Sequence, residues 1–355
     1  MRLVNIDKVE RRMILGKTLY DQQGNVLLPK GADLWPFVEH LKGFKIYFLY
    51  IDDELSKDIE AWDILSSHTR QYILELMRQA ERVYRPITEP GKRIMANLAF
   101  DKISSMIAED IFAQTELHLD MSELITNDIY TFEHQLNVAI VASLIGKMLD
   151  MNCVEIKAIC LGALLHDVGL LALPEHIRTK LAASEPLTNF DFAEYKKYPQ
   201  LGYDLIKHDA SIPLNSKAAI MQHKECFDGS GFPKNTNSGD ISQTARIVAI
   251  ADIFDELLRG KGMASDKPLH IHQIIEYIQN HAGSAFDPEL AKAFAKHAIL
   301  FPNGIIVKLN DGRKGIVINQ NLDAVARPII RMTHDTNEIV NLLEDSSLVI
   351  EDIEL

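Results

Sequence analysis

Helical periodicity through the middle of the chain constrains the fold more than any other feature of the sequence. Apolar residues recur at helical spacing through 136–148, 155–165 and 245–258, while the alternation typical of strands is scarce there. The segment is about 180 residues long, at the upper end of common domain sizes. We therefore predict one all-α domain over residues 120–298.

Shorter patterns of a different kind flank this helical segment. Residues 1–55 alternate apolar runs with Gly and Pro turn signals, which predicts a small β or α+β module. Residues 56–119 have the pattern of a charged helical connector. Near the end, two β-rich runs flank Asn310-Asp311-Gly312, a strong hairpin signal, and further strand candidates follow. We predict a small SH3-like β-barrel module over 301–355, and a fold that is mainly α with β modules at both ends.

Composition excludes several classes of protein. The 37 Lys and Arg residues against 50 Asp and Glu leave a net charge of -13, which would repel a nucleic-acid polymer. No apolar run reaches the length of about 18 residues that a membrane span needs, and the first residues do not resemble a signal peptide. Cys153, Cys160 and Cys226 are an odd number without CxxC spacing, typical of reduced thiols. We expect a cytoplasmic protein with no membrane span.

A His-Asp doublet at the end of one predicted helix is the sharpest local feature. His166 and Asp167 follow an apolar run and precede Val168-Gly169. Neighbouring residues on a regular helix point about 100° apart, so both reach one metal ion only where the helix ends or loosens. We expect Gly169 to supply that conformational freedom. Taken alone, the doublet also fits a purely structural role, in which His166 interacts with the free carbonyls at a helix C-terminus and no metal ion is bound.

Two further residues strengthen the metal interpretation. His134 begins an apolar helix, and Asp252 lies inside an almost wholly apolar one. Burying a carboxylate without a partner costs several kcal/mol, and a metal ion is a natural partner. The alternatives are a satisfied core histidine at His134 and a buried salt bridge or cap at Asp252.

The order of these residues on a helical scaffold resembles the HD superfamily of metal-dependent phosphohydrolases. Between the doublet and Asp252, the run QHKECFDGSGFP (222–233) resembles the HHExxDGxGYP signature of the HD-GYP family. The resemblance covers roughly residues 125–298. It extends to three flanking segments: 201–206, 245–252 and 286–290.

This resemblance implies packed helices around a metal centre and hydrolysis of cyclic di-GMP, to the linear dinucleotide or on to GMP. In that chemistry a water or hydroxide attacks phosphorus while two or three metal ions stabilise charge. Mixed nitrogen and oxygen ligands suit Fe or Mn, with Zn or Ni as alternatives. The resemblance implies metal binding by His134, His166, Asp167, His223 and Asp252, and ligand binding by Gly229, Gly231, Arg259 and Lys261. As catalytic residues we predict Asp167, His223 and Lys224.

The sequence departs from the family pattern at several positions near this centre. Leu170 replaces the lysine of HDxGK, and Tyr198 replaces the histidine of HPxxGY. Lys224 replaces the second histidine of HHE, and Tyr130 stands where some members with three metals carry glutamate. Phe232 in place of the signature tyrosine is a mild change.

These departures affect the two metal positions unequally. The first metal position keeps a complete set of ligands: His134, His166, Asp167 and Asp252. The second metal position would keep only His223 and a carboxylate of Asp167 that bridges the two ions. We expect the Lys224 ammonium to act as a built-in cation that pairs with Asp167 or with a substrate phosphate.

Three functions follow from this pattern. The first is a cyclic di-GMP phosphodiesterase with a reduced centre of as few as one ion and with weak or lost hydrolysis. The second is a non-catalytic module that binds cyclic di-GMP or docks a diguanylate cyclase or another signalling protein. The third is a one-metal hydrolase of another phosphate ester. Metal content and turnover separate the three.

Overall fold

The computed structural model of the chain divides by its contacts into two units. One comprises Met1–Ile64, His118–Glu133 and Lys296–Leu355, and the other comprises Leu65–Leu117 and His134–Ala295. The residues described are 1–20, 26–44, 46, 48–59, 64–65, 69, 72–73, 76, 90–114, 133–183, 185–260 and 267–354. Tyr130 and Lys261, singled out above, lie outside them.

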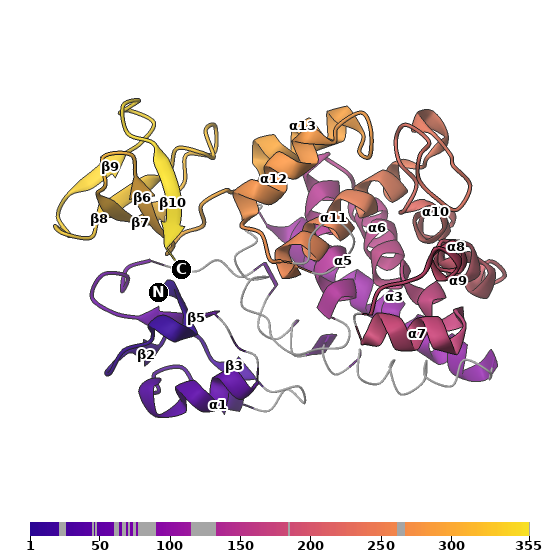
Figure 1. The fold of residues 1–355 in the computed structure, drawn as a ribbon, viewed down its shortest axis with the longest axis horizontal. Helices are drawn as coiled ribbons and strands as arrows, with labels where there is room; N and C mark the ends of the chain where they lie inside the picture. The colour runs from indigo at the N-terminus through magenta and orange to yellow at the C-terminus, as the bar shows by residue number, and fades with distance from the viewer. Residues whose placement is uncertain are drawn as a thin grey trace. The chain divides into compact units, whose positions relative to one another are not determined.

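Helices build the second unit (Figure 1). They are α3 (Pro90–Ala113), α5 (Glu133–Met148), α6 (Cys153–Leu165), η3 (Val168–Ala172), α7 (Glu175–Ala182), α8 (Asn189–Tyr195), α9 (Tyr198–Ile206), α10 (Leu214–Gln222), η4 (Ser238–Asp240), α11 (Gln243–Arg259), α12 (Ile271–Asn280) and α13 (Pro288–His297). The three helices that periodicity predicted most clearly are confirmed as α5, α6 and α11. Among the described residues, no helix combines the length and the apolar content needed to cross a bilayer.

Helix α6 occupies the core of this unit. A capping box between Asn152 and Glu155 begins it, and nearly every residue from Ile156 onward is buried. A helix that is apolar all round needs neighbours on every side, and α3, α10 and α11 pack against it. The Ser216 hydroxyl on α10 donates a hydrogen bond to the Ala158 carbonyl at 2.6 Å, fixing how α10 and α6 meet. This packing holds the C-terminal end of α6 in place.

Small antiparallel sheets build the first unit. Near the N-terminus β1 (Arg2–Asn5), β5 (Phe48–Asp52) and β2 (Ile14–Leu15) form one sheet in that order, and β3 (Leu19–Tyr20) pairs with β4 (Val26–Leu28). Short helical turns η1 (Ile6–Lys8), η2 (Trp35–Phe37) and α1 (Val38–Gly43) accompany them around an apolar cluster that includes Leu15, Leu41 and Ile51.

A second sheet, of five strands, lies near the C-terminus. Its order is β10 (Ile350–Glu354), β6 (Ile306–Leu309), β7 (Lys314–Asn319), β8 (Ile329–Met332) and β9 (Ile339–Asn341), all antiparallel. The predicted hairpin is confirmed between β6 and β7, and Gly312 in its turn has a φ of +85°. Strands β9 and β10 form the two edges of the sheet.

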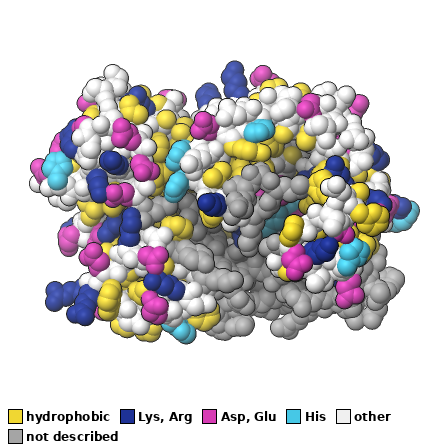
Figure 2. Space-filling view, viewed as in Figure 1, with side chains coloured by type: hydrophobic (Ala, Val, Ile, Leu, Met, Phe, Trp, Pro, Cys, Tyr) yellow, Lys and Arg dark blue, Asp and Glu magenta, His cyan; other side chains and the backbone are white. Residues whose placement is uncertain are grey.

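Contacts between the two ends of the chain hold the first unit together. The Leu3 N–H donates to the Gly304 carbonyl at 3.2 Å. The Arg331 guanidinium on β8 binds both Asp58 carboxylate oxygens, at 2.8 and 2.5 Å. On the face drawn in Figure 2, acidic and basic side chains are interspersed over the described surface.

Candidate metal centre

The His-Asp doublet lies where α6 gives way to η3. His166 follows the last residue of α6, and Asp167 precedes the first residue of η3. The role expected of Gly169 is wrong, because its φ is not positive. A Cβ at Gly169 would lie 1.9 Å from the Tyr198 carbonyl oxygen and 2.6 Å from the Gly202 nitrogen. The glycine is needed so that α9 can approach η3 closely.

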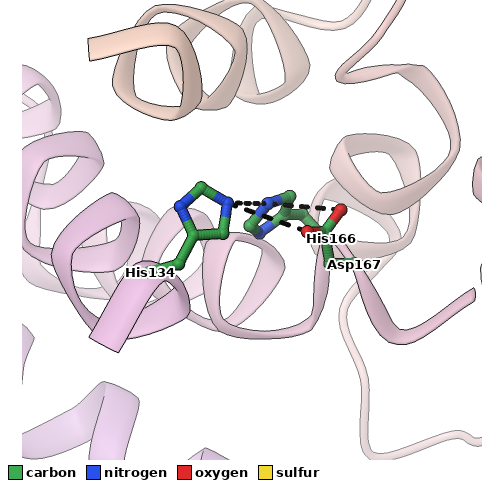
Figure 3. Close-up of side chains that lie close together, drawn as sticks. All are labelled: His134, His166 and Asp167. Atoms are coloured by element: carbon green, nitrogen blue, oxygen red, sulfur yellow. Dashed lines mark hydrogen bonds and ion pairs between the residues drawn. The ribbon is translucent and has the colours of Figure 1, made fainter. Parts of the chain in front are cut away.

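Two histidines turn the same ring nitrogen toward a common point (Figure 3). His134, in the first turn of α5, has its Nδ1 2.8 Å from Asp255 Oδ2, and His166 has its Nδ1 2.6 Å from the Ala163 carbonyl oxygen. Because both Nδ1 atoms face acceptors, they carry the protons of the neutral rings. The two Nε2 atoms lie 3.2 Å apart. Their lone pairs repel unless a proton or a metal ion lies between them.

Two carboxylates face the same point. Asp252 Oδ1 lies 3.2 Å from His134 Nε2 and 3.6 Å from His166 Nε2. Asp167 lies 3.7 and 3.5 Å from the same two nitrogens. Asp252 Oδ1 is buried and has no hydrogen-bond donor among the described residues, an arrangement that is costly without a cation. Two imidazole nitrogens and two carboxylates are a donor set that fits a first-row divalent ion.

The electrostatics of the centre favour positive charge. Burial by itself lowers the pKa of His134, but Asp252 and Asp255 more than offset burial and hold that pKa well above its usual value. Burial raises the pKa of Asp252, and the charges of Lys224 and the histidines lower it well below the usual range. A proton and a metal ion therefore compete for the same nitrogen atoms.

His223 faces the centre but is already hydrogen-bonded at both ring nitrogens. Its Nδ1 contacts the carbonyls of Ala219 and Ile220 at 3.2 and 3.1 Å, and its Nε2 lies 2.7 Å from the Tyr198 hydroxyl. Burial and the neighbouring His166 lower the pKa of His223 to about 3, so the ring is neutral. Burial raises the pKa of Tyr198 well above its usual value. The tyrosine therefore keeps its proton, and its hydroxyl donates a hydrogen bond to the Nε2 of His223.

The Lys224 ammonium has different partners from those expected. It lies 2.7 Å from Asp252 Oδ2 and 2.8 Å from Glu256 Oε1, rather than against Asp167. Asp252 and Glu256 are four residues apart on α11 and so share one face of the helix. Burial lowers the pKa of Lys224, but these two carboxylates more than offset burial and hold it well above its usual value.

A family assignment follows from the comparison with known proteins. The HD domain family model matches residues 93–290, more than half of the chain. The chain belongs to the HD domain family. Its signature segment resembles the HD-GYP members, with the replacements at Leu170, Tyr198 and Lys224 making it a divergent one.

Two curated relatives are named as cyclic di-GMP phosphodiesterases. PA4108 of Pseudomonas aeruginosa is 25% identical over 282 residues, covering 78% of this chain and 64% of that protein. PdeB of Borreliella burgdorferi is 28% identical over 220 residues, covering 62% of this chain and 56% of that protein. The chain thus spans less than two thirds of either relative. Among solved structures, the HDG"Y"P protein Bd1817 of Bdellovibrio bacteriovorus matches 82% of this chain and 97% of its own, with 16% identity and a TM-score of 0.46.

In this HD domain the signature loop stabilises its own shape. Glu225 accepts hydrogen bonds from the backbone N–H groups of Lys234 and Thr236 at 2.7 and 2.9 Å, so its carboxylate has a structural role in the loop. A Cβ at Gly231 would lie 2.2 Å from the Cys226 nitrogen, so the loop closes only around glycine. Gly229 has a φ of +83°. The loop geometry accounts for both glycines, and their role in ligand binding stays a prediction.

A network behind His134 was missed at the sequence level. Asp255, which orients His134, also accepts a hydrogen bond from Asn137 Nδ2 at 2.8 Å and pairs with Arg259 Nε at 2.8 Å. Spacing held a signal for it, because Asp255 follows Asp252 by three residues and Asn137 follows His134 by three. Arg259, expected to contact a ligand, thus has its Nε against Asp255, and its ligand-binding role stays a prediction.

Proposed function

We propose that this HD-family chain is a metal-dependent phosphodiesterase-like protein of the HD-GYP type that acts on cyclic di-GMP, with a reduced metal centre and weak or lost hydrolysis. The observation that carries the proposal is the convergence of the His134 and His166 Nε2 atoms and the buried Asp252 Oδ1 on one point. The relatives named as cyclic di-GMP phosphodiesterases support the substrate.

His134, His166, Asp167 and Asp252 would hold the ion, with Fe or Mn the best match to their donor atoms. A bound divalent ion supplies charge neutralisation at phosphorus and lowers the pKa of water. The protein contributes orientation, since Asp255 and the Ala163 carbonyl fix the two imidazole rings.

Three side chains support the proposal that activity is reduced. Tyr198 engages the Nε2 of His223, and Lys224 puts a positive charge against Asp252. Leu170 packs with Leu173 and Ile177 in an apolar cluster, so it supplies no charge to hold a phosphate or assist a leaving oxygen.

The Tyr198–His223 hydrogen bond also favours a second candidate. A centre limited in this way suits a non-catalytic module that binds cyclic di-GMP or docks a diguanylate cyclase or another signalling protein. In either case Gly229, Gly231, Arg259 and Lys261 would contact the dinucleotide. The terminal modules, of which the C-terminal one would be SH3-like, would serve as interaction platforms in the cytoplasm.

Metal content and turnover on one sample test the proposal. We expect protein purified anaerobically to carry one ion per chain by elemental mass spectrometry and to hydrolyse cyclic di-GMP slowly. Asp167→Ala should lose the ion and the turnover. His176→Ala, which changes a mostly exposed histidine paired with Asp191, should keep them. Absence of metal and of turnover, even after Mn or Fe is supplied, would contradict the enzyme and leave the binding module.

A further inference from the structure

An ammonium group lies between two carboxylates on the far side of Asp252 from the imidazoles. Asp252 Oδ1 faces the Nε2 atoms of His134 and His166, while Oδ2 lies 2.7 Å from Lys224 Nζ. Glu256 Oε1 contacts the same ammonium at 2.8 Å. The Asp252 carboxylate therefore faces two positions that favour a positive charge. Its Oδ1 faces the metal position between the imidazoles, and its Oδ2 faces the Lys224 ammonium.

This second position needs a cation. Asp252 is almost fully buried, and the side chains of Lys224 and Glu256 are each only 20% exposed. Two carboxylates held together with so little solvent repel each other strongly, and removing the charge that pairs them is costly. Burial raises the pKa of Glu256 even with Lys224 present.

The remaining groups around this position are also engaged. The His223 Nε2 lies only 3.8 Å from Asp167 Oδ1 but accepts a hydrogen bond from the Tyr198 hydroxyl. The atoms of His166, His223 and Asp252 that could bind a metal all lie within 4.8 Å of one another. His166 Nε2 belongs to the first ion's donor set, which leaves Asp252 Oδ2 and His223 Nε2 as donor atoms for a second ion. Lys224 engages Asp252 Oδ2, and Tyr198 engages His223 Nε2.

We propose that the Lys224 ammonium takes the place of a second metal ion, so that the chain binds one ion and a neutral residue at this position lets a further ion bind. This inference deepens the proposed function and rests on it for the identity of the first ion. An ammonium neutralises Asp252 and Glu256 as a cation would. It offers no open coordination position, so it cannot replace the ion's effect on water.

Counting bound Mn²⁺ tests the inference. The full chain is stripped with a chelator, equilibrated with Mn²⁺ and analysed by elemental mass spectrometry. We expect one ion in the wild type and two in Lys224→Met. We expect one in Lys224→Arg, which keeps the charge. The matched control is Lys180→Met, which breaks a Lys–Asp pair of the same length, 2.7 Å to Asp191, outside the centre.

Each outcome decides a separate point. The wild-type count tests the proposed function, and a count of zero would contradict it. The difference between Lys224→Met and the wild type tests the inference, and equal counts would overturn it.

A measurement on the wild type alone tests the inference even if the variant does not fold. Electron paramagnetic resonance should show the hyperfine pattern of isolated Mn²⁺, and an exchange-coupled pair would overturn the inference.

Discussion

Each histidine of the centre uses its Nδ1 for a contact that determines where its Nε2 points. His134 contacts the Asp255 carboxylate, whereas His166 and His223 contact backbone carbonyls of their own helices. The order of the motif residues along the chain was enough to predict that His134, His166 and His223 lie close together, because these residues themselves supply the donor atoms. It could not predict what Tyr198 and Lys224 contact, because those partners come from separate helices that meet only after packing.

Removing the Tyr198 hydroxyl should destabilise the helical unit. In Tyr198→Phe the buried His223 Nε2 loses its donor, so we expect the free energy of unfolding to fall by about 1–3 kcal/mol. Urea denaturation measures the loss. The control is Tyr203→Phe on the same helix, where the change should stay within about 0.5 kcal/mol. Equal effects of the two substitutions would show that the hydroxyl bond to His223 contributes nothing.

At the scale of elements, the centre depends on how closely η3 and α9 pack. Apolar periodicity predicted α5, α6 and α11, since a helix that buries one face or its whole surface shows that pattern in its own residues. The contact between η3 and α9 has no such periodic signal. It depends on Gly169 and Gly202, where two backbones approach each other without side chains between them.

Gly169→Ala should separate these two elements. The new Cβ would overlap the Tyr198 carbonyl oxygen at 1.9 Å, and neither backbone can move independently of its helix. We expect a loss of unfolding free energy of at least about 2 kcal/mol, together with weaker metal binding, because η3 begins directly after Asp167. Gly239→Ala is the control, since nothing lies within 4 Å of its new Cβ. A stable Gly169→Ala protein with wild-type metal affinity would contradict this account.

At the scale of the whole molecule, segments from both ends of the chain make up one unit. The strand patterns at each end were visible in the sequence because alternation is local. Their association was not, because it depends on single contacts such as Asp58 with Arg331, which are 273 residues apart.

The Asp58–Arg331 pair should make the first unit sensitive to acid. Arg331 lowers the pKa of Asp58 from 3.8 to about 2, so the pair stabilises the folded state above pH 3.8 and loses that effect as pH falls through the folded pKa. Because the carboxylate is more than half exposed, solvent screening limits the effect to about 0.5–1 kcal/mol. We expect Asp58→Asn to be less stable than the wild type by that amount at neutral pH. The difference should shrink as the pH falls from 3.8 and vanish below about pH 2. A difference in unfolding free energy that is independent of pH would contradict this.

The separation of Asp58 and Arg331 along the chain also affects how the protein is made. A ribosome adds about 5–20 residues per second, so about 14–55 s pass between the synthesis of Asp58 and that of Arg331, 273 residues later. The apolar cluster around Leu15 and Ile51 can assemble early, because all its residues come from the first part of the chain. The contacts of Leu3 with Gly304 and of Asp58 with Arg331 form only after the whole helical unit has been translated. Docking of the two ends is therefore a late step of biosynthesis, and the helical unit has time to fold before it.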